Sequence, residues 1–135
     1  GLVTPDASTR VLMRSLATRD EELMIEFRRQ ADMLHRIKHP NVAAVLGCCR
    51  ETADAQLLLM EYHQLGNLKT HLLTSSQPWS LAQIHSATVQ IAKGMNVIAQ
   101  ARFVHRDLGT RNILVGYQGK EVNIKCNSRF SSRVN

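Results

Sequence analysis

Residues 103–115 read FVHRDLGTRNILV, and this stretch contains HRDL with an asparagine five residues after the aspartate. The aspartate, Asp107, is a carboxylate of the kind that accepts the proton of an attacking hydroxyl. The asparagine, Asn112, supplies an amide oxygen of the kind that holds a magnesium ion on phosphate groups. Phosphoryl transfer needs such a carboxylate and amide on one short loop. The spacing therefore predicts a loop built for phosphate chemistry, and the rest of the chain is interpreted around it.

The stretch resembles the catalytic loop of protein kinases, in which HRDL and the later asparagine are a signature. The segment RDLGTRN at 106–112 is similar to RDLA(A/T)RN of tyrosine kinases. Serine/threonine kinases usually have Lys-Pro-Glu where this chain has Gly-Thr-Arg. Upstream, FRR at 27–29 and LGNLK at 65–69 resemble the protein tyrosine kinase seven/off-track group of receptors, whose kinase domain is degenerate. The resemblance extends over roughly residues 10–130.

This resemblance implies a partial protein-kinase-like fold of the α+β class. The chain has 135 residues, enough for one ordinary domain but fewer than a kinase domain contains. Residues 1–62 are expected to form a partial N-lobe, with its later strands and the regulatory helix. Residues 63–135 are expected to form a partial C-lobe, with its first helices and the catalytic-loop hairpin, truncated after the position of the Asp-Phe-Gly motif.

Charge and cysteine content exclude some classes of function. The net charge is +6, but the basic residues are scattered and no aromatic residues alternate with them, which favours a solvated surface over nucleic-acid binding. The three cysteines lack metal-ligand spacing and fit a reducing compartment. No apolar run is long enough to span a membrane. The resemblance to receptors implies a membrane span outside this chain, with these residues on the cytoplasmic face of a single-pass plasma-membrane protein.

Hydrophobic periodicity predicts strands and helices in the order found in kinases. Strands are expected at 11–16, 42–49 and 56–60, helices at 20–36, 68–73 and 81–99, and a hairpin with strands at 113–115 and 121–125 around a turn at 116–119. Thr18 or Asp20 is expected to cap the first helix and Ser80 the third.

Most of the nucleotide-binding positions that the resemblance assigns carry altered residues. Arg14 stands where kinases place a lysine that pairs the phosphates, and Gln30 stands where a helix glutamate completes that ion pair. Gln30 can accept a hydrogen bond from Arg14, but it supplies no charge. Leu12 replaces an alanine that lies against adenine, so its side chain would intrude on the base. Met60 is at the gatekeeper position and Leu114 beneath the base. Ordinary structural roles remain open: Arg14 as a surface charge, Gln30 as an exposed helix residue, and Met60 as plain core.

The metal position is altered as well. Kinases follow the hairpin with Asp-Phe-Gly, whose aspartate chelates magnesium. Residues 126–128 here are Cys-Asn-Ser, and a shift of two positions in either direction finds no carboxylate. Cys126 is a poor ligand for magnesium, which prefers oxygen donors. Two residues of the catalytic loop keep roles that the resemblance implies without catalysis: His105 packs between the lobes, and Arg106 receives an activation-loop phosphate.

These substitutions favour a pseudokinase segment of a receptor-like protein, acting as a signalling co-receptor or scaffold that binds other receptor or signalling proteins, with no cofactor. The alternative is an active ATP-dependent protein tyrosine kinase with a divergent pocket, which would require ATP and magnesium and which Asp107 and Asn112 support. A third hypothesis, a nucleotide binder without turnover, is opposed by Leu12. Electrostatic stabilisation dominates phosphoryl transfer, so the missing metal-chelating aspartate favours the first hypothesis.

Overall fold

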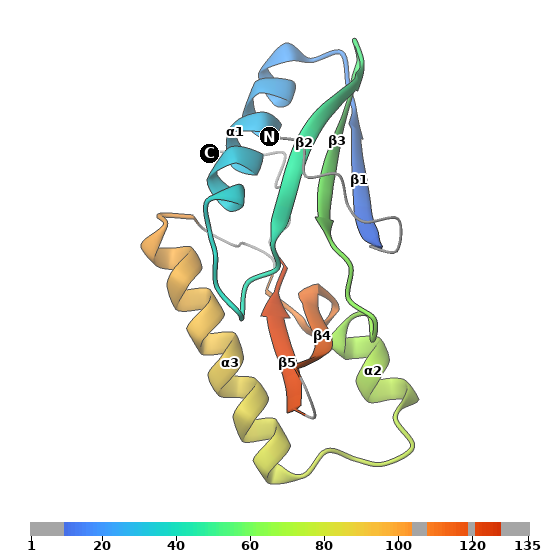
Figure 1. Ribbon diagram of the computed structural model, residues 1–135, viewed down its shortest axis with the longest axis vertical. Helices are drawn as coiled ribbons and strands as arrows, with labels where there is room; N and C mark the ends of the chain where they lie inside the picture. The colour runs from blue at the N-terminus through green and yellow to red at the C-terminus, as the bar shows by residue number, and fades with distance from the viewer. Residues whose placement is uncertain (1–9, 104–107, 119–120, 128–135) are drawn as a thin grey trace.

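The computed structural model describes residues 10–103, 108–118 and 121–127, which form two parts arranged along the long axis of the molecule (Figure 1). The upper part is a three-stranded antiparallel sheet with one helix. The lower part is a two-stranded hairpin between two helices. This mixed arrangement confirms the expected α+β class, while the expected division into a partial N-lobe at 1–62 and a partial C-lobe at 63–135 stays a prediction.

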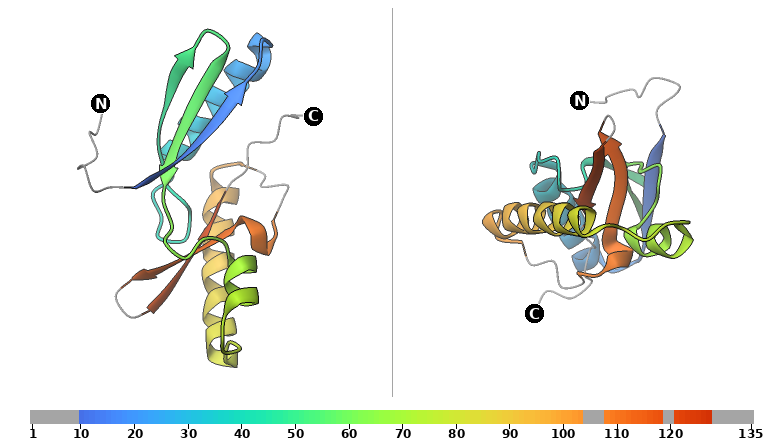
Figure 2. Two further views of the ribbon diagram at one scale, coloured as in Figure 1. Left: turned by 90° about the vertical axis from the view of Figure 1, so that its right-hand side faces the viewer. Right: turned by 90° about the horizontal axis from the view of Figure 1, so that it is seen from below.

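The upper sheet consists of β1 (Val11–Ala17), β2 (Val45–Thr52) and β3 (Ala55–Glu61), in the order β1-β3-β2. Burial alternates along the central strand β3, with Gln56, Leu58 and Met60 buried. Helix α1 (Glu21–His35) covers this buried face, and its Phe27 and Leu34 share one core with the strand (Figure 2). Alternate side chains of β3 and the side chains on one face of α1 therefore pack together in a single apolar layer.

Helix α1 begins where the sequence predicted, because the side chain of Asp20 accepts hydrogen bonds from the backbone amides of Glu22 and Leu23. The apolar periodicity of this stretch predicts a buried stripe of Leu23, Phe27, Met33, Leu34 and Ile37, and the observed buried face of α1 differs from it. Met24 and Ala31 are buried in addition to Phe27 and Leu34, whereas Leu23 and Met33 are only half-buried. The face is therefore rotated slightly from the one that the largest apolar residues suggest.

The lower part contains α2 (Leu68–Thr74), α3 (Leu81–Gln100), a 3-10 turn η1 (Thr110–Asn112), β4 (Ile113–Gln118) and β5 (Glu121–Cys126). Asn67 caps α2, and Ser80 caps α3 through reciprocal hydrogen bonds with Gln83. The expected turn at 116–119 is wrong in position, because Gly116 pairs with Asn123 and the ladder continues to Gln118. None of the described helices is both long and apolar enough to cross a membrane.

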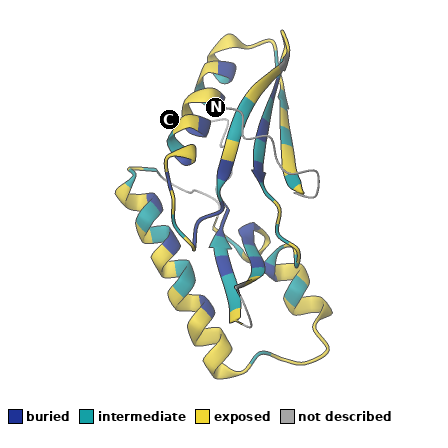
Figure 3. Cartoon of the chain, in the orientation of Figure 1, coloured by how far each residue is buried: buried dark blue, intermediate teal, exposed yellow. Residues whose placement is uncertain are grey.

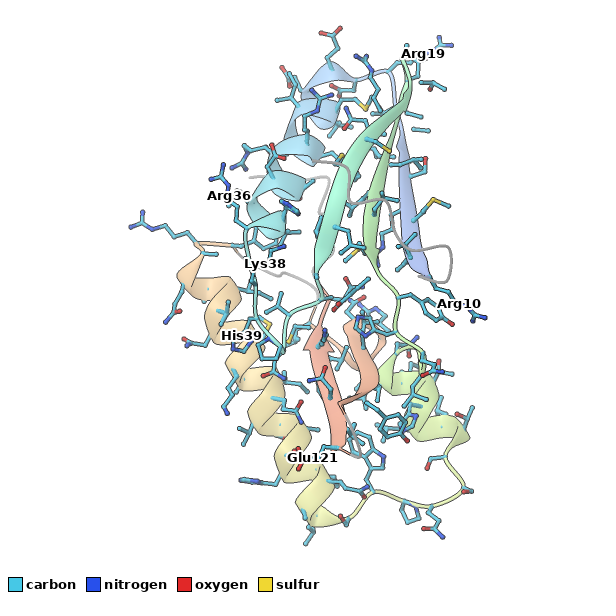
Figure 4. The ribbon with its side chains drawn as sticks, in the orientation of Figure 1. Arg10, Arg19, Arg36, Lys38, His39 and Glu121 are labelled. Atoms are coloured by element: carbon cyan, nitrogen blue, oxygen red, sulfur yellow. The ribbon has the colours of Figure 1, made fainter. Side chains whose placement is uncertain are left out.

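The two parts meet at the loop that follows α1. The expected strand at 42–49 begins later, at Val45, because Val42 and Ala43 pair instead with Cys126 at the end of β5. Most of the buried residues gather around this junction and under the sheet, while the outer side of α3 is exposed (Figure 3). Figure 4 shows Arg36 and Lys38 projecting to solvent from this loop.

A polar clasp fastens α3 to the same junction. Gln90 on α3 accepts a hydrogen bond from the backbone amide of Ile124 (2.8 Å) and donates one to the carbonyl of Val122 (3.1 Å), as a neighbouring strand would. Its Oε1 also accepts from Asn41 Nδ2 at 3.1 Å. Close by, Gly94 lets the helix backbone approach, since a Cβ there would lie 2.3 Å from the Asn41 carbonyl oxygen. The clasp fixes the position of β5 relative to the loop after α1.

Candidate functional site

The register of β1 against β3 places the altered nucleotide-position residues on one face of the upper sheet. Leu12 is the direct partner of Met60, and Arg14 is the partner of Leu58. Since directly opposed residues share a face, all four point to the side that α1 covers. Met60 is fully buried, whereas 37% of Leu12 is exposed. Leu12 therefore lies at the open margin of this face, beside the buried gatekeeper position.

Gln30 is buried in this face, so the open alternative of an exposed helix residue is wrong. Its Nε2 donates to Glu26 Oε1 at 2.9 Å, and the same carboxylate forms an ion pair with Arg29 at 2.6 Å. The hydrogen bond from Arg29 lowers the pKa of Glu26, with help from Gln30 and against the effect of burial. Among the described residues, no donor reaches Gln30 Oε1, so the hydrogen bond that Arg14 could have given it is not formed.

Residues 61–63, here called the hinge, begin with the last residue of β3 and carry the most strongly bonded charge of the site. Glu61 Oε1 accepts hydrogen bonds from the amide of Ala44 at 3.1 Å and from Lys125 Nζ at 2.7 Å, and it lies 3.1 Å from His63 Nε2. Burial by itself would raise the pKa of Glu61, but contact with His63, Lys125 and the Ala44 amide outweighs burial and lowers the pKa to about 2. Glu61 is therefore ionised and links the upper part to β5.

The front of the hinge is covered by a second contact. The guanidinium of Arg10 lies 5.9 Å from the ring centre of Tyr62, a distance at which a cation is attracted to an aromatic face. Val11, the next residue, is the cross-strand partner of Glu61. The beginning of β1 and the hinge are thus joined on two sides, by backbone pairing and by this stacked charge.

The lower side of the site is formed by η1 and the hairpin. Leu114 is half-buried and is the cross-strand partner of Lys125, so both lie on the same face of the hairpin. The backbone of Leu114 also forms a β-bridge with Asn67, the N-cap residue of α2. Asn112 is buried, and its carbonyl accepts a hydrogen bond from the amide of Asn127 at 2.9 Å. This backbone contact ties the end of β5 to the 3-10 turn.

The side chain of Cys126 points to the face of the hairpin opposite to Leu114 and Lys125. Its side chain is fully buried, and its Sγ lies 3.6 Å from the carbonyl of Ile91 on α3. Burial raises the pKa of the Cys126 thiol to about 11, so the group is a neutral thiol at physiological pH. The sulfur therefore belongs to the core between the hairpin and α3. Residue 126 could contact a metal ion on the Leu114 side of the hairpin only if the end of β5 turned its side chain to the other face.

Three of the catalytic-loop residues, His105, Arg106 and Asp107, lie outside the described residues. Leu12, Arg14 and Met60 share the face of the sheet on which α1 packs, Gln30 is buried on α1, and Leu114 and Asn112 belong to β4 and the 3-10 turn. In the described part of the chain no group of three or more His, Cys, Asp or Glu side chains is arranged to hold a metal ion. The roles assigned to these residues for nucleotide, metal and catalysis stay predictions.

Sequence reasoning missed the contact between Glu61 and Lys125. Lys125 lies in a predicted strand and Glu61 directly follows another, but 64 positions separate them, and neither belongs to the catalytic motif. The signal that could have found them is an acidic residue at the end of an apolar strand and a lysine between Ile124 and Cys126, since a half-buried charge requires a partner.

Comparison with known proteins fits this geometry. A family model described as protein tyrosine and serine/threonine kinase matches residues 3–126. The chain belongs to the protein tyrosine and serine/threonine kinase family. It is similar to inactive tyrosine-protein kinase 7 of Gallus gallus (44% identical over 116 residues, 80% of this chain) and of Homo sapiens (40% over 126 residues, 87%). It is also similar to the tyrosine-protein kinase-like otk of Drosophila melanogaster (39% over 119 residues, 78%). The matched region is 11–12% of each of these relatives.

Proposed function

We propose that this chain is part of a receptor-type pseudokinase that binds other receptor or signalling proteins and transfers no phosphate. The observation that carries the proposal is the end of β5, where phosphoryl transfer needs a magnesium-binding carboxylate. This chain has the buried thiol of Cys126 there, and no carboxylate occurs within two positions of it. Magnesium prefers oxygen donors, so the residues present do not fit the ion.

The upper part supports the same proposal. A kinase positions its phosphate-binding lysine by an ion pair with a carboxylate on the regulatory helix. Here Arg14 stands on the strand, and Gln30 on the helix is bonded to Glu26 instead. The guanidinium group of arginine is planar and spreads its charge over several N–H donors, whereas the ammonium group of lysine is compact. Arg14 therefore does not reproduce the contact that lysine makes with phosphate.

The place of the protein in the cell follows from the relatives by analogy. The relatives from chicken and human are named as inactive tyrosine kinases, and the fly relative as kinase-like. We place this chain on the cytoplasmic face of a plasma-membrane protein whose membrane span lies elsewhere in the polypeptide. Its output would be a protein contact, as co-receptor or scaffold, with no requirement for ATP or magnesium.

The test is transfer of radiolabelled phosphate from ATP to a Tyr-containing polymer by the complete kinase-like domain. The expected result is no transfer above that of an Asp107→Asn variant, which removes the carboxylate expected to act as base. Transfer that disappears in that variant would establish the alternative, an active tyrosine kinase, which Asp107 and Asn112 favour. It would also end the pseudokinase proposal.

Restoring a single catalytic position should not restore activity, because residues that act as a unit are not additive. The informative variant combines Leu12→Ala, Arg14→Lys and Gln30→Glu with a new metal ligand. Cys126→Asp would place a carboxylate against the Ile91 carbonyl and should destabilise the core. A parallel variant with Ser128→Asp, two residues later, offers the ligand at the shifted register. Activity in one combined variant and in none of the single changes is the expected pattern.

A further inference from the structure

A hollow of about 250 Å³ lies between α1 and β2, at the edge of the sheet opposite to β1 and its Leu12. Its floor includes the buried residues Ala31 and Gln56. Its walls are polar on both sides, formed by Arg28, Asp32 and His35 from α1 and by Gly47, Cys48 and Arg50 from β2. The hollow takes no part in the site described above.

Gly47 contributes only backbone to the hollow. In the register of β2 against β3, Gly47 is opposed to Leu59 on the face away from α1, whereas Cys48 is opposed to the buried Leu58 and faces α1. The wall of the hollow at Gly47 is therefore bare backbone, and the side chain of Cys48 beside it points toward α1.

Two arginines face this space. Arg28 forms no hydrogen bond or ion pair with any described residue, while Arg50 uses Nε and Nη2 on the carbonyls of Thr52 and Ala53 and keeps its remaining N–H groups. Burial raises the pKa of the Cys48 thiol, and the charge of Arg28 opposes that rise, which shows that the field of Arg28 reaches the wall of the hollow. An anion entering here would meet a free guanidinium.

The remaining walls add two acceptors, one of which carries a negative charge. The Nδ1 of His35 donates its proton to the Val45 carbonyl at 2.8 Å, so Nε2 of the neutral ring is an acceptor. Asp32, one turn after Arg28, can accept an N–H from a ligand that carries an amide beside its acidic group. A peptide offers both an acidic side chain and a backbone N–H, whereas a free inorganic ion offers only the anion.

We propose that this hollow binds one acidic side chain, carrying a carboxylate or a phosphate, of a partner polypeptide. Its volume is below the range of about 300–1,000 Å³ that is usual for small-molecule sites, and it suits a single side chain with its adjoining backbone. Guanidinium groups bind carboxylate and phosphate oxygens by paired hydrogen bonds. The inference rests on the proposed function, because it names the chemistry by which a scaffold of this kind would hold a partner.

The test is titration of the complete, isotope-labelled kinase-like domain with three short peptides, monitored by the backbone amide signals of Gly47 and Cys48. The peptides are Gly-Ser-Glu-Ser-Gly, the same peptide with phosphoserine in place of glutamate, and the same peptide with glutamine. Saturable shifts are expected with at least one of the two acidic peptides and not with the glutamine peptide. The tighter of the two acidic peptides identifies which oxyanion is bound.

Three variants locate the binding. Arg28→Ala removes the free guanidinium, and Cys48→Leu fills the hollow, because Cys48 lines it and is opposed to the buried Leu58 on the face toward α1. Each should weaken the acidic peptide at least tenfold. Arg29→Ala is the matched control, since Arg29 is on the same helix but is paired with Glu26, and it should leave the affinity within twofold of the unmutated domain.

Equal weakening by Arg28→Ala and Arg29→Ala would overturn the proposal, as would undiminished binding to the filled variant or no saturable binding of either acidic peptide. These outcomes are separate from those for the pseudokinase. Phosphate transfer by the unmutated domain would refute the pseudokinase proposal, but it would not change the result of the peptide titration.

Discussion

Replacing Gln90 by alanine should destabilise the complete domain by about 2–4 kcal/mol. The change removes both partners that the helix offers to β5, so the amide of buried Ile124 and the carbonyl of Val122 lose their hydrogen bonds. A buried polar group left without a partner costs about 1–3 kcal/mol. Asn41 loses one bond but keeps its contact with the carbonyl of Ile124. Alanine recovers only a few tenths of a kcal/mol in helix propensity.

Urea unfolding followed by circular dichroism measures this effect. With a slope of about 2 kcal/mol per molar urea, the midpoint should fall by roughly 1–2 M at unchanged slope. Gln100→Ala is the matched control, because Gln100 is exposed on the same helix. A double-mutant cycle with Asn41→Ala should give a coupling of about 0.5–3 kcal/mol. If Gln90→Ala and Gln100→Ala unfold within 0.5 kcal/mol of each other, the clasp does not stabilise the junction.

Three further predictions concern Glu61 in the hinge, the altered nucleotide positions and the exposed helices. The pKa of Glu61 is lowered from 4.5 to about 2, so its ionised form stabilises the fold above pH 4.5 and this contribution is lost as the pH falls toward 2. Screening at the partly exposed pair limits the contribution to about 1–2 kcal/mol, and Lys125→Met should reduce this pH dependence in a melting series without abolishing it, because His63 and the Ala44 amide also lower the pKa. In the complete domain ATP with magnesium should not raise the melting temperature, and tighter binding by Leu12→Ala would support the steric explanation, whereas millimolar or better affinity of the unmutated domain would refute it. The isolated chain should be oligomeric or unstable in sedimentation and thermal melts, because Leu73 and Leu81 are 76% and 85% exposed on α2 and α3; a monomer with a sharp cooperative melt would contradict this.

The helices could be predicted closely because their ends are determined locally. Asp20, Asn67 and Ser80 each cap a helix through hydrogen bonds to amides two or three residues away. The hairpin turn could not be placed as well. Gly116 and Gly119 both look like turn residues, but pairing of Tyr117 with Val122 extends the strands past the first of them. Cross-strand contacts, which the local sequence does not display, decided the position of the turn.

The altered positions were assigned from motifs with fixed spacing, and their roles stay predictions. Their surroundings could not be predicted from those motifs. Gln30 is buried against Glu26, a residue one turn away that no motif identifies. The direction of Cys126 depends on where β5 stops pairing with β4, since each further residue of a strand reverses the face. A motif can therefore identify a position in the chain, and only the packing around it determines where its side chain points.

The close approach at Gly94 restricts how the two parts of the molecule can move. Any rotation of α3 by one residue would carry the side chain of Lys93 or Met95 into the space where even a Cβ would lie 2.3 Å from the Asn41 carbonyl. We therefore expect α3 to keep this rotational setting against the loop after α1 and not to slide along the loop in small steps. Relative motion of the two parts is then expected to be a rotation about this contact, a hinge-type rather than a shear-type movement.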